Sequence, residues 1–382
     1  MSKKLDYFTE SVIREMTRLS EERSAVNLSQ GMPDFDPPAE LVNAAVNALK
    51  NGHNQYPITW GQKSLRNALA RKLKLHNGID ADPDKNITVT CGATEAVTAA
   101  VLALTDPGDR IVVTDPFYEN YVPDAILAGA DLTYVPFKGT ELHLDQEGLK
   151  SAMEKRPKLV MVNTPNNPTG RVLSRSELEM IADLSQEFDS IVITDEIYEH
   201  ITYDGKQHIS LASIGDMFER TVTVSGASKT YSVTGWRVGW AIANEHMSNA
   251  IRKIHDYLTI GAPTPLQEAL VTGLEFPMTY YNELAEAYDK KRKIMMNILK
   301  ECKIEFIQPE GAYYILADAP EKFADGEEFT RFLLERAGVA VLPAAALYHD
   351  KKLGARKIRL AFCKKDETMR ETQRRLAQVD WN

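Results

Sequence analysis

Short apolar runs alternate with amphipathic, helix-like segments over the first two thirds of the chain. Six such runs fall at residues 86–91, 110–115, 158–163, 190–195, 221–225 and 238–243. Apolar residues at consecutive positions in runs of this length are typical of parallel strands that are buried on both faces. Strands that alternate with helices predict an α/β layered fold, in which ligands bind beyond the carboxyl ends of the strands.

The pattern changes beyond about residue 275. A charged helical stretch there leads into two short strand-like segments, 312–318 and 357–362. These segments are separated by another amphipathic helical stretch, which is typical of an α+β arrangement. The sequence therefore predicts a second, smaller α+β domain at the C-terminal end.

Composition narrows the class of protein. The 382 residues are enough for two domains, and 43% hydrophobic with 26% charged residues is typical of a soluble enzyme. The first residues lack the apolar segment of a secretory signal, and no apolar run reaches the roughly 18–20 residues of a membrane span. We therefore expect a cytoplasmic protein that does not associate with membranes.

Charge and cysteine content exclude further classes. The formal net charge is −9 and no basic run is present, which argues against nucleic acid as a partner. The three cysteines are isolated from one another, so the sequence predicts neither a disulfide framework nor a zinc site, and we expect no metal. The expected partner is a small molecule.

The residues that follow the predicted strands carry the candidate chemistry. The run 86–91 is followed by Gly92 and an alanine-rich helical segment, and the run 158–163 by the turn-forming sequence TPNNPTG. The run 190–195 ends at Asp195, three residues before Tyr198, and the run 221–225 leads into a small-residue loop that contains Lys229. These side chains should meet at one edge of the sheet.

Lys229 has two possible roles. The sequence GASKT resembles the end of a nucleotide-binding phosphate loop, but that loop needs glycine directly before the lysine, and Ser228 stands there. The acidic strand that would hold magnesium also precedes the loop instead of following it. The alternative is a nucleophilic lysine that forms a Schiff base with a carbonyl cofactor.

Pyridoxal phosphate would make demands that nearby residues can meet. Asp195, at a strand end, could pair with the pyridine nitrogen of the cofactor. The helix that starts at Ala93 and Thr94 could bind the phosphate through its free N–H groups, and Arg237 could add the matching charge. Tyr118, just past the run 110–115, could cover the face of the ring.

Nine segments, taken together and in order, resemble the class I and II aminotransferases of fold type I, which are pyridoxal-phosphate enzymes. They are NLSQGMPDFDPP (27–38), NQYPITWGQKSLRNALA (54–70), GATEA (92–96), DPFYENY (115–121), NTPNNPTG (163–170), TDEIYEHI (194–201), SGASKTYSVTGWRVGW (225–240), EGAYYILAD (310–318) and KIRLAF (357–362). The resemblance covers essentially the whole chain.

The resemblance implies a fold and a division of the chain. The fold is a mainly parallel seven-stranded sheet in a large domain, joined to a smaller α+β domain. Residues 1–30 would form an N-terminal arm and part of the small domain, residues 31–275 the large cofactor-binding domain, and residues 276–382 the small domain.

The resemblance also implies a role for each cofactor-binding residue. Lys229 would carry the Schiff base and then act as general base, and Asp195 would bind the pyridine nitrogen. Asn167 and Tyr198 would hydrogen-bond the phenolic oxygen. Ala93, Thr94 and Arg237 would bind the phosphate. Tyr118 would stack on the cofactor ring.

Substrate and subunit contacts follow from the same resemblance. Arg359 would clamp the substrate α-carboxylate, with help from the Gly31 backbone and the Asn167 amide. Tyr56 would reach the cofactor phosphate of a neighbouring subunit, which implies a homodimer with shared sites.

The chain departs from the family pattern at one place. Many members carry serine or threonine three residues before the lysine, where this chain has Gly226. Ser228 is then the better candidate for a phosphate ligand, and Ser225 the weaker one.

The expected reaction is ping-pong transamination between an L-amino acid and a 2-oxo acid. Residues 258–267 and Met32 offer small or apolar side chains near the predicted site, which favours aromatic amino acids or methionine as donors, with 2-oxoglutarate as acceptor. The alternatives are an aspartate aminotransferase, or a cysteine-conjugate β-lyase on the same scaffold.

Overall fold

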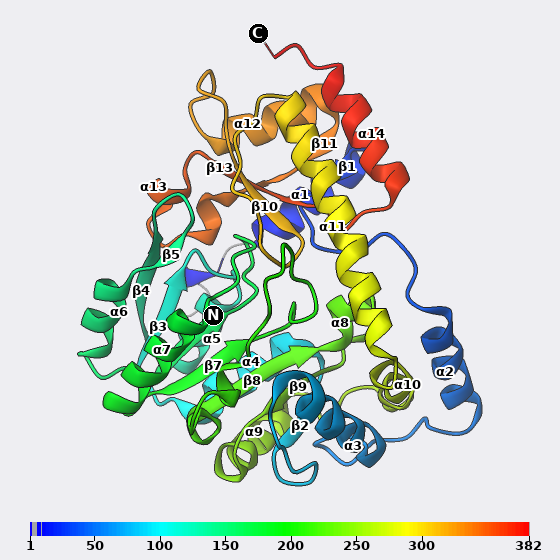
Figure 1. The fold of residues 1–382 in the computed structure, drawn as a ribbon, viewed down its shortest axis with the longest axis vertical. Coiled ribbons are helices and arrows are strands. Elements are labelled where there is room, and N and C mark those ends of the chain that lie inside the picture. Colours follow the sequence, from blue (N-terminus) through cyan, green and yellow to red (C-terminus); the bar gives the residue numbers. More distant parts are fainter. Residues whose placement is uncertain (2–5, 9, 382) are drawn as a thin grey trace.

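A computed structural model describes residues 1, 6–8 and 10–381 of the chain. Its largest element is an eight-stranded sheet with the order β2-β9-β8-β7-β6-β3-β4-β5 (Figure 1). The strands are β2 (Ile87–Thr90), β3 (Arg110–Asp115), β4 (Asp131–Lys138), β5 (His143–Leu144), β6 (Leu159–Asn163), β7 (Ile191–Asp195), β8 (Thr221–Gly226) and β9 (Gly239–Ile242). All six apolar runs are strands, and the predicted α/β fold is confirmed.

The sheet has one strand more than the predicted seven, because the two-residue β5 pairs antiparallel with β4 at the edge. β9 runs antiparallel to both of its neighbours, β2 and β8. The pairs from β8 through β7, β6 and β3 to β4 are parallel. Successive carboxyl ends of these parallel strands therefore meet along one edge.

Alternate strand residues enter two different cores. Ile111 and Met161 pack in a cluster with helices α4 (Gly92–Leu104), α5 (Tyr121–Ala128) and α9 (Glu245–Leu258). Their neighbours Val112 and Val160 pack instead with α6 (Gln146–Met153) and α7 (Arg175–Glu187). Because successive strand side chains point to opposite faces, helices must cover both faces, and this explains the unbroken apolar runs.

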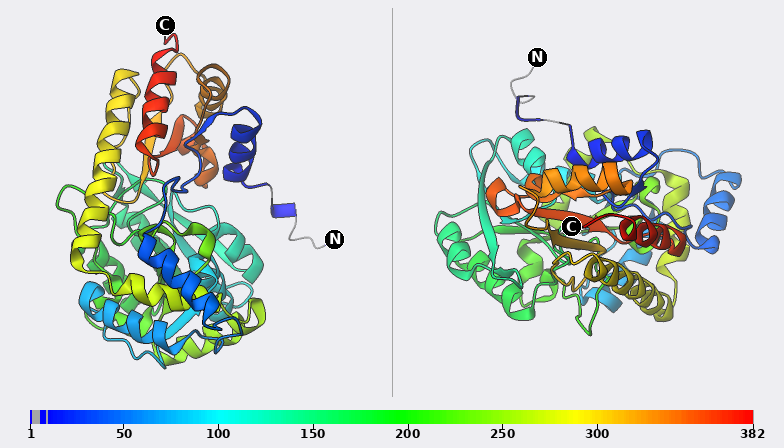
Figure 2. Two further views of the ribbon diagram at one scale, coloured as in Figure 1. Left: turned by 90° about the vertical axis from the view of Figure 1, so that its right-hand side faces the viewer. Right: turned by 90° about the horizontal axis from the view of Figure 1, so that it is seen from above.

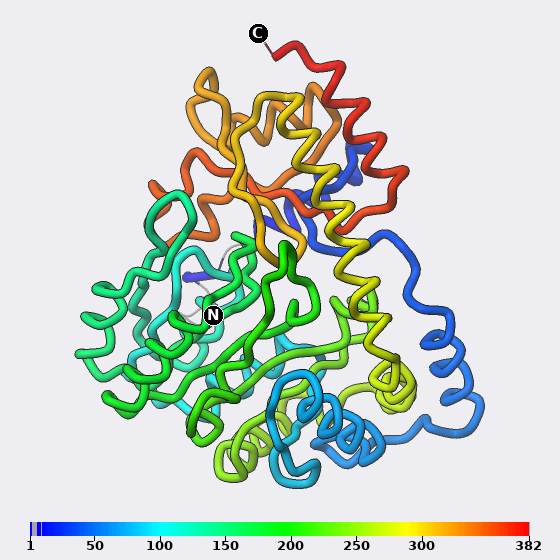
Figure 3. Tube along the Cα trace, viewed as in Figure 1, coloured from blue at the N-terminus to red at the C-terminus, as the bar shows by residue number. Residues whose placement is uncertain are grey.

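A third cluster closes the β2 end of the sheet. It contains Leu41, Leu65 and Leu270 from α2 (Ala39–Lys50), α3 (Lys63–Lys72) and α10 (Thr264–Leu274). The tube in Figure 3 follows the chain from the upper region down through α2 to this end. Tyr56 lies in the segment that joins α2 and α3.

The C-terminal elements form a separate layer above the sheet edge. A three-stranded antiparallel sheet has the order β10-β13-β12. Its strands and the helices around it are β10 (Tyr314–Asp318), β12 (Leu342–Pro343), β13 (Lys357–Ala361), α11 (Met278–Glu301), α12 (Gly326–Phe332), α13 (Lys351–Gly354) and α14 (Asp366–Ala377). Figure 2 shows α11 and α14 side by side over this sheet.

The N-terminal segment joins this C-terminal layer. β1 (Val26–Asn27) pairs in parallel with β11 (Val339–Ala340), and α1 (Val12–Glu22) precedes it. Figures 1 and 2 show these blue elements beside the orange and red ones. The domain boundaries near residues 30 and 275 stay a prediction. Among the described helices, none combines the length and the apolar character that crossing a membrane requires.

Candidate active site

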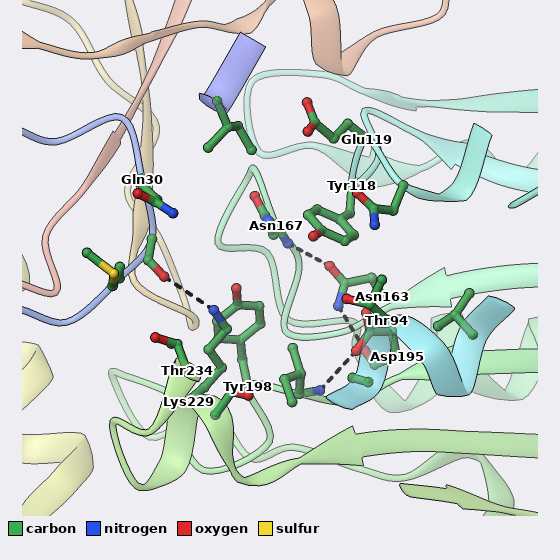
Figure 4. A pocket seen from close by; sticks show the side chains of 18 of the residues that line it. Gln30, Thr94, Tyr118, Glu119, Asn163, Asn167, Asp195, Tyr198, Lys229 and Thr234 are labelled. Atoms are coloured by element: carbon green, nitrogen blue, oxygen red, sulfur yellow. Dashed lines mark hydrogen bonds between the residues drawn. The ribbon is translucent and has the colours of Figure 1, made fainter. Parts of the chain in front are cut away.

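A cavity of about 520 Å³ opens at the carboxyl ends of the parallel strands (Figure 4). Every predicted site residue lines it except Tyr56 and Ser225, the weaker of the two candidate phosphate ligands. The predicted residues that line it are Gly31, Ala93, Thr94, Tyr118, Asn167, Asp195, Tyr198, Ser228, Lys229, Arg237 and Arg359. The register of the sheet explains part of this convergence, because Asn163 at the end of β6 lies opposite Asp195 at the end of β7.

Lys229 projects into the cavity from α8 (Ala227–Thr230), the short helix that follows β8. Its Nζ donates a hydrogen bond to the carbonyl oxygen of Gly31 at 3.2 Å (Figure 4). Burial lowers the pKa of Lys229 to about 8, and the nearby positive charges of Arg237 and Arg359 act in the same direction. A larger fraction of neutral amine is therefore present near pH 7 than for an ordinary lysine, as a nucleophile requires.

Asp195 is held by hydrogen bonds on both carboxylate oxygens. The Tyr121 hydroxyl donates to Oδ2 at 2.8 Å, and the Ile197 N–H donates to Oδ1 at 3.2 Å. The Asn163 side chain donates to the Asp195 main-chain oxygen at 2.8 Å. Burial raises the pKa of Asp195 to about 6, although the Tyr121 hydrogen bond opposes this rise. A cation placed against this carboxylate would restore its charge.

The N-terminus of α4 and the Arg237 guanidinium form a cradle for an anion. Gly92 has a φ of +84°, and a Cβ at this position would lie 2.3 Å from Arg237 Nη2. A Cβ on Gly239 would lie 2.4 Å from the nitrogen of Ala93. Both glycines therefore let main chain and guanidinium approach closely. Free N–H groups, the helix dipole and a fixed cation together suit a phosphate dianion.

The structure separates the two candidate serines. Ser228 lines the cavity beside Lys229. The hydroxyl of Ser225 instead donates to Glu199 Oε1 at 2.8 Å, and its side chain is buried. This geometry favours Ser228 as the phosphate ligand.

Arg359 is fully buried on β13 without an anionic partner among the described residues. Its Nη1 donates to Asn167 Oδ1 at 2.9 Å, and its Nη2 donates to the Ser29 carbonyl oxygen at 2.6 Å. The guanidinium lies 4.4 Å from the centre of the Tyr314 ring, and Nε has no hydrogen-bond partner in the described part of the chain. A buried guanidinium with an unused donor is expected to receive an anion.

Tyrosines form one wall of the cavity. The hydroxyls of Tyr198 and Tyr314 lie 3.2 Å apart, and their rings meet edge to face. Tyr118 meets Tyr121 edge to face at 5.7 Å between ring centres. Burial raises the pKa of Tyr118 to about 12 and raises the pKa of Tyr198 well above its usual value, so both hydroxyls are neutral hydrogen-bond donors at neutral pH.

Tyr56 lies outside this cavity and is 80% exposed. The structure contains one copy of the chain, so the predicted contact of Tyr56 with a neighbouring subunit stays a prediction.

Sequence reasoning missed three side chains that shape the site. Tyr121 and Tyr314 belong to quoted segments, but their spacing gave no reason to prefer them over core aromatics. Lys364 is 4% exposed, and its Nζ donates to the carbonyl oxygens of Met32 at 2.9 Å and Gln30 at 3.4 Å. It therefore fixes the main chain on either side of Gly31. The only indication of Lys364 in the sequence is its position five residues after the predicted site residue Arg359.

A possible metal cluster behind the site is already occupied by protein donors. Glu196, Glu199 and His208 place ligand atoms within 4.8 Å of one another. Ser210 and His208 bind the two oxygens of Glu196, while Ser225 binds one oxygen of Glu199. The other oxygen of Glu199 accepts from Asn77 and from Lys72. All four carboxylate oxygens are thus satisfied without a metal.

Comparison with known proteins decides the family. The family model for aminotransferase class I and II matches residues 23–376. This chain belongs to that family. The probable N-succinyldiaminopimelate aminotransferase DapC of Mycobacterium tuberculosis is 36% identical over 97% of this chain and 96% of its own length. The methionine aminotransferase of Escherichia coli is 35% identical over 98% of this chain and 97% of its own.

The structure agrees with this assignment. The solved structure of N-succinyldiaminopimelate aminotransferase from Mycobacterium tuberculosis matches with a TM-score of 0.96, 36% identity and 99% coverage of both chains. Members of the family depend on pyridoxal phosphate, so the chain is a pyridoxal-phosphate-dependent aminotransferase of fold type I. Its substrates are amino acids and 2-oxo acids.

The lining residues fit this cofactor on three independent features. The buried carboxylate of Asp195 suits a protonated pyridine nitrogen. The cradle of Gly92 and Arg237 suits a phosphate, and the Lys229 amine has a lowered pKa suited to an aldehyde.

Proposed function

We propose that this aminotransferase takes the amino group from aromatic amino acids or methionine and passes it to 2-oxoglutarate. The observation that carries the proposal is the convergence of Lys229, Asp195, Arg237 and Arg359 on one cavity whose mouth includes the apolar Met32. The methionine aminotransferase of Escherichia coli, similar over nearly the whole chain, supports a methionine donor.

Pyridoxal phosphate, when bound, withdraws electrons from the substrate Cα so that its proton becomes acidic. Lys229 Nζ would bind the cofactor aldehyde and, once released by substrate, move the proton at Cα. The carboxylate of Asp195, held by Tyr121 and the Ile197 N–H, would keep the pyridine nitrogen protonated. Tyr198 would donate a hydrogen bond to the phenolic oxygen, assisted by Asn167.

Two anion sites would fix the ends of cofactor and substrate. Arg237 would hold the phosphate together with the N–H groups of Ala93 and Thr94 and the Ser228 hydroxyl. Arg359 would bind the substrate α-carboxylate through a bidentate pair, beside the Asn167 amide and the Gly31 main chain. Tyr118 would cover the cofactor ring. Holding both ends orients the Cα proton toward Lys229.

We further propose a homodimer in which Tyr56 reaches the partner's phosphate site. Large apolar side chains are exposed around Tyr56 and on the face of α2, which a second copy would cover: Val42, Val46, Leu49, Ile58, Tyr257, Leu258 and Ile260. Light scattering of the purified protein should give twice the mass of 42.8 kDa. A monomeric, fully active protein would refute the shared site.

The donor preference is tested by steady-state kinetics with single amino acids and 2-oxoglutarate. Phenylalanine or methionine should exceed aspartate in kcat/KM. A preference for aspartate by tenfold or more, about 1.4 kcal/mol, would refute the proposed donors.

A further inference from the structure

The mouth of the cavity contains a cation that the proposed roles leave unused. Four basic residues line the cavity in the described chain: Arg14, Lys229, Arg237 and Arg359. The cofactor aldehyde, the phosphate and the substrate α-carboxylate account for the last three. Arg14 remains, and no hydrogen bond or ion pair joins it to any residue that the structure describes.

The helix itself does not explain an arginine at this position. Arg14 is the third residue of α1 (Val12–Glu22), where the positive end of the helix dipole disfavours a cation. Arg18, one turn further along, is by contrast paired with Glu22 at 3.1 Å and with Glu10 at 3.8 Å. The comparison of the two arginines indicates that Arg14 is available for a ligand.

Contacts on both sides of Arg14 fix this part of α1 over the cavity. The Ser11 hydroxyl donates to Glu119, beside Tyr118, and the Thr17 hydroxyl lies 3.2 Å from Gln30 Oε1. Arg14 is three residues from each of them and therefore lies on the same side of the helix. Figure 4 shows Gln30 and Glu119 on the two sides of the cavity, above Lys229.

The positive charge of Arg14 selects an anion as its ligand. Two carboxylates besides Asp195 line the cavity, and each already accepts a hydrogen bond: Glu119 from the Ser11 hydroxyl and Asp124 from the Thr98 hydroxyl. Arg359 binds the α-carboxylate deep in the cavity under the proposed function, whereas Arg14 is exposed at the mouth. The two guanidinium groups thus offer separate sites for the two ends of a dicarboxylate.

We propose that Arg14 binds the distal carboxylate of a dicarboxylic 2-oxo acid, so that the acceptor is selected by charge at the mouth. This inference rests on the proposed function. The same mouth is lined by Ile13 and Met32, which accept an apolar donor side chain. One cavity then serves both half-reactions, with the donor side chain on the apolar residues and the acceptor carboxylate on Arg14.

The test measures the acceptor half-reaction of the aminated holoenzyme with two 2-oxo acids of similar length, 2-oxoglutarate and 4-methylthio-2-oxobutanoate. R14Q should lower kcat/KM for 2-oxoglutarate about tenfold and leave the value for the apolar acid within about twofold. R14K should recover part of the loss. R18Q, the matched control on the same helix, should change neither value.

An equilibrium titration with glutarate gives a readout that does not depend on turnover. R14Q should bind glutarate about tenfold more weakly than the wild type. Equal effects of R14Q on both acceptors, or no effect on either, would overturn the role of Arg14. The donor half-reaction with methionine needs no acceptor, so its failure in the wild type would refute the proposed donor instead.

Discussion

The inner end of the cavity and its mouth are built differently. At the inner end, Asp195 on β7 and Arg359 on β13 are buried, and each side chain makes two hydrogen bonds. At the mouth, Arg14 is exposed and unpaired within the described chain, and Met32 is 45% exposed. Rigid, preorganised groups suit chemistry that is the same for every substrate, whereas adaptable groups suit the choice of substrate.

Lys229→Ala changes the inner end of the cavity and should have the largest effect on activity. Loss of the amine that moves the Cα proton should lower the transamination rate by about a thousandfold or more. The thermal unfolding temperature should change little, since the half-buried amine contacts one carbonyl. Turnover near the wild-type rate would exclude Lys229 as the reactive residue.

Arg359→Gln should have the next largest effect. It removes the buried cation and leaves Asn167 and the Ser29 carbonyl without their donor. Truncating one partner of a buried charged pair costs about 2–5 kcal/mol, so kcat/KM should fall at least about thirtyfold for every donor. A loss restricted to one class of donor would place Arg359 in substrate choice instead of α-carboxylate binding.

Gly92→Ala should weaken binding of pyridoxal phosphate about tenfold, because the new Cβ would displace the Arg237 guanidinium. Gly52→Ala is the matched control, since its φ of +87° imposes similar backbone strain but no atom lies within 4 Å of its Cβ. Each variant should lose about 1–2 kcal/mol of unfolding free energy. If both variants bound the cofactor equally well, the assignment of Gly92 and Arg237 to the phosphate site would be wrong.

Lys364→Met tests whether a residue between the inner end and the mouth affects substrate binding without affecting the chemical step. Lys364 touches no reacting group and acts through the Gln30–Met32 main chain, so we expect an increase of a few fold in KM with kcat nearly unchanged. Lys364→Arg, which can still donate to both carbonyls, should recover most of the wild-type KM. A fall of a few fold in kcat with no change in KM would contradict a positioning role.

The strands of the large sheet were predictable because two helical layers bury both of their faces. β4 escaped prediction because it lies near the edge, has several partly exposed residues and contains Pro136. Its two-residue partner β5 is too short to leave a periodic signal.

The site was predictable where its residues follow strand ends, as for Asp195 and Lys229. It was not predictable where function depends on packing between distant segments. Tyr121 differs from a core tyrosine by its hydrogen bond to Asp195 and its place on the cavity wall, and Arg14 differs from a surface arginine by lining the same cavity. The domain boundaries, the cytoplasmic location and the dimer stay predictions.

The most direct test of the central claim is the pH dependence of cofactor capture by the apoenzyme, followed by stopped-flow absorbance. Only the neutral amine attacks an aldehyde, and burial lowers the pKa of Lys229 to about 8. The rate constant should therefore rise about tenfold per pH unit below 8 and level off above it. A rate that keeps rising to pH 10, as for an ordinary lysine, would contradict a preorganised amine at the inner end of the cavity.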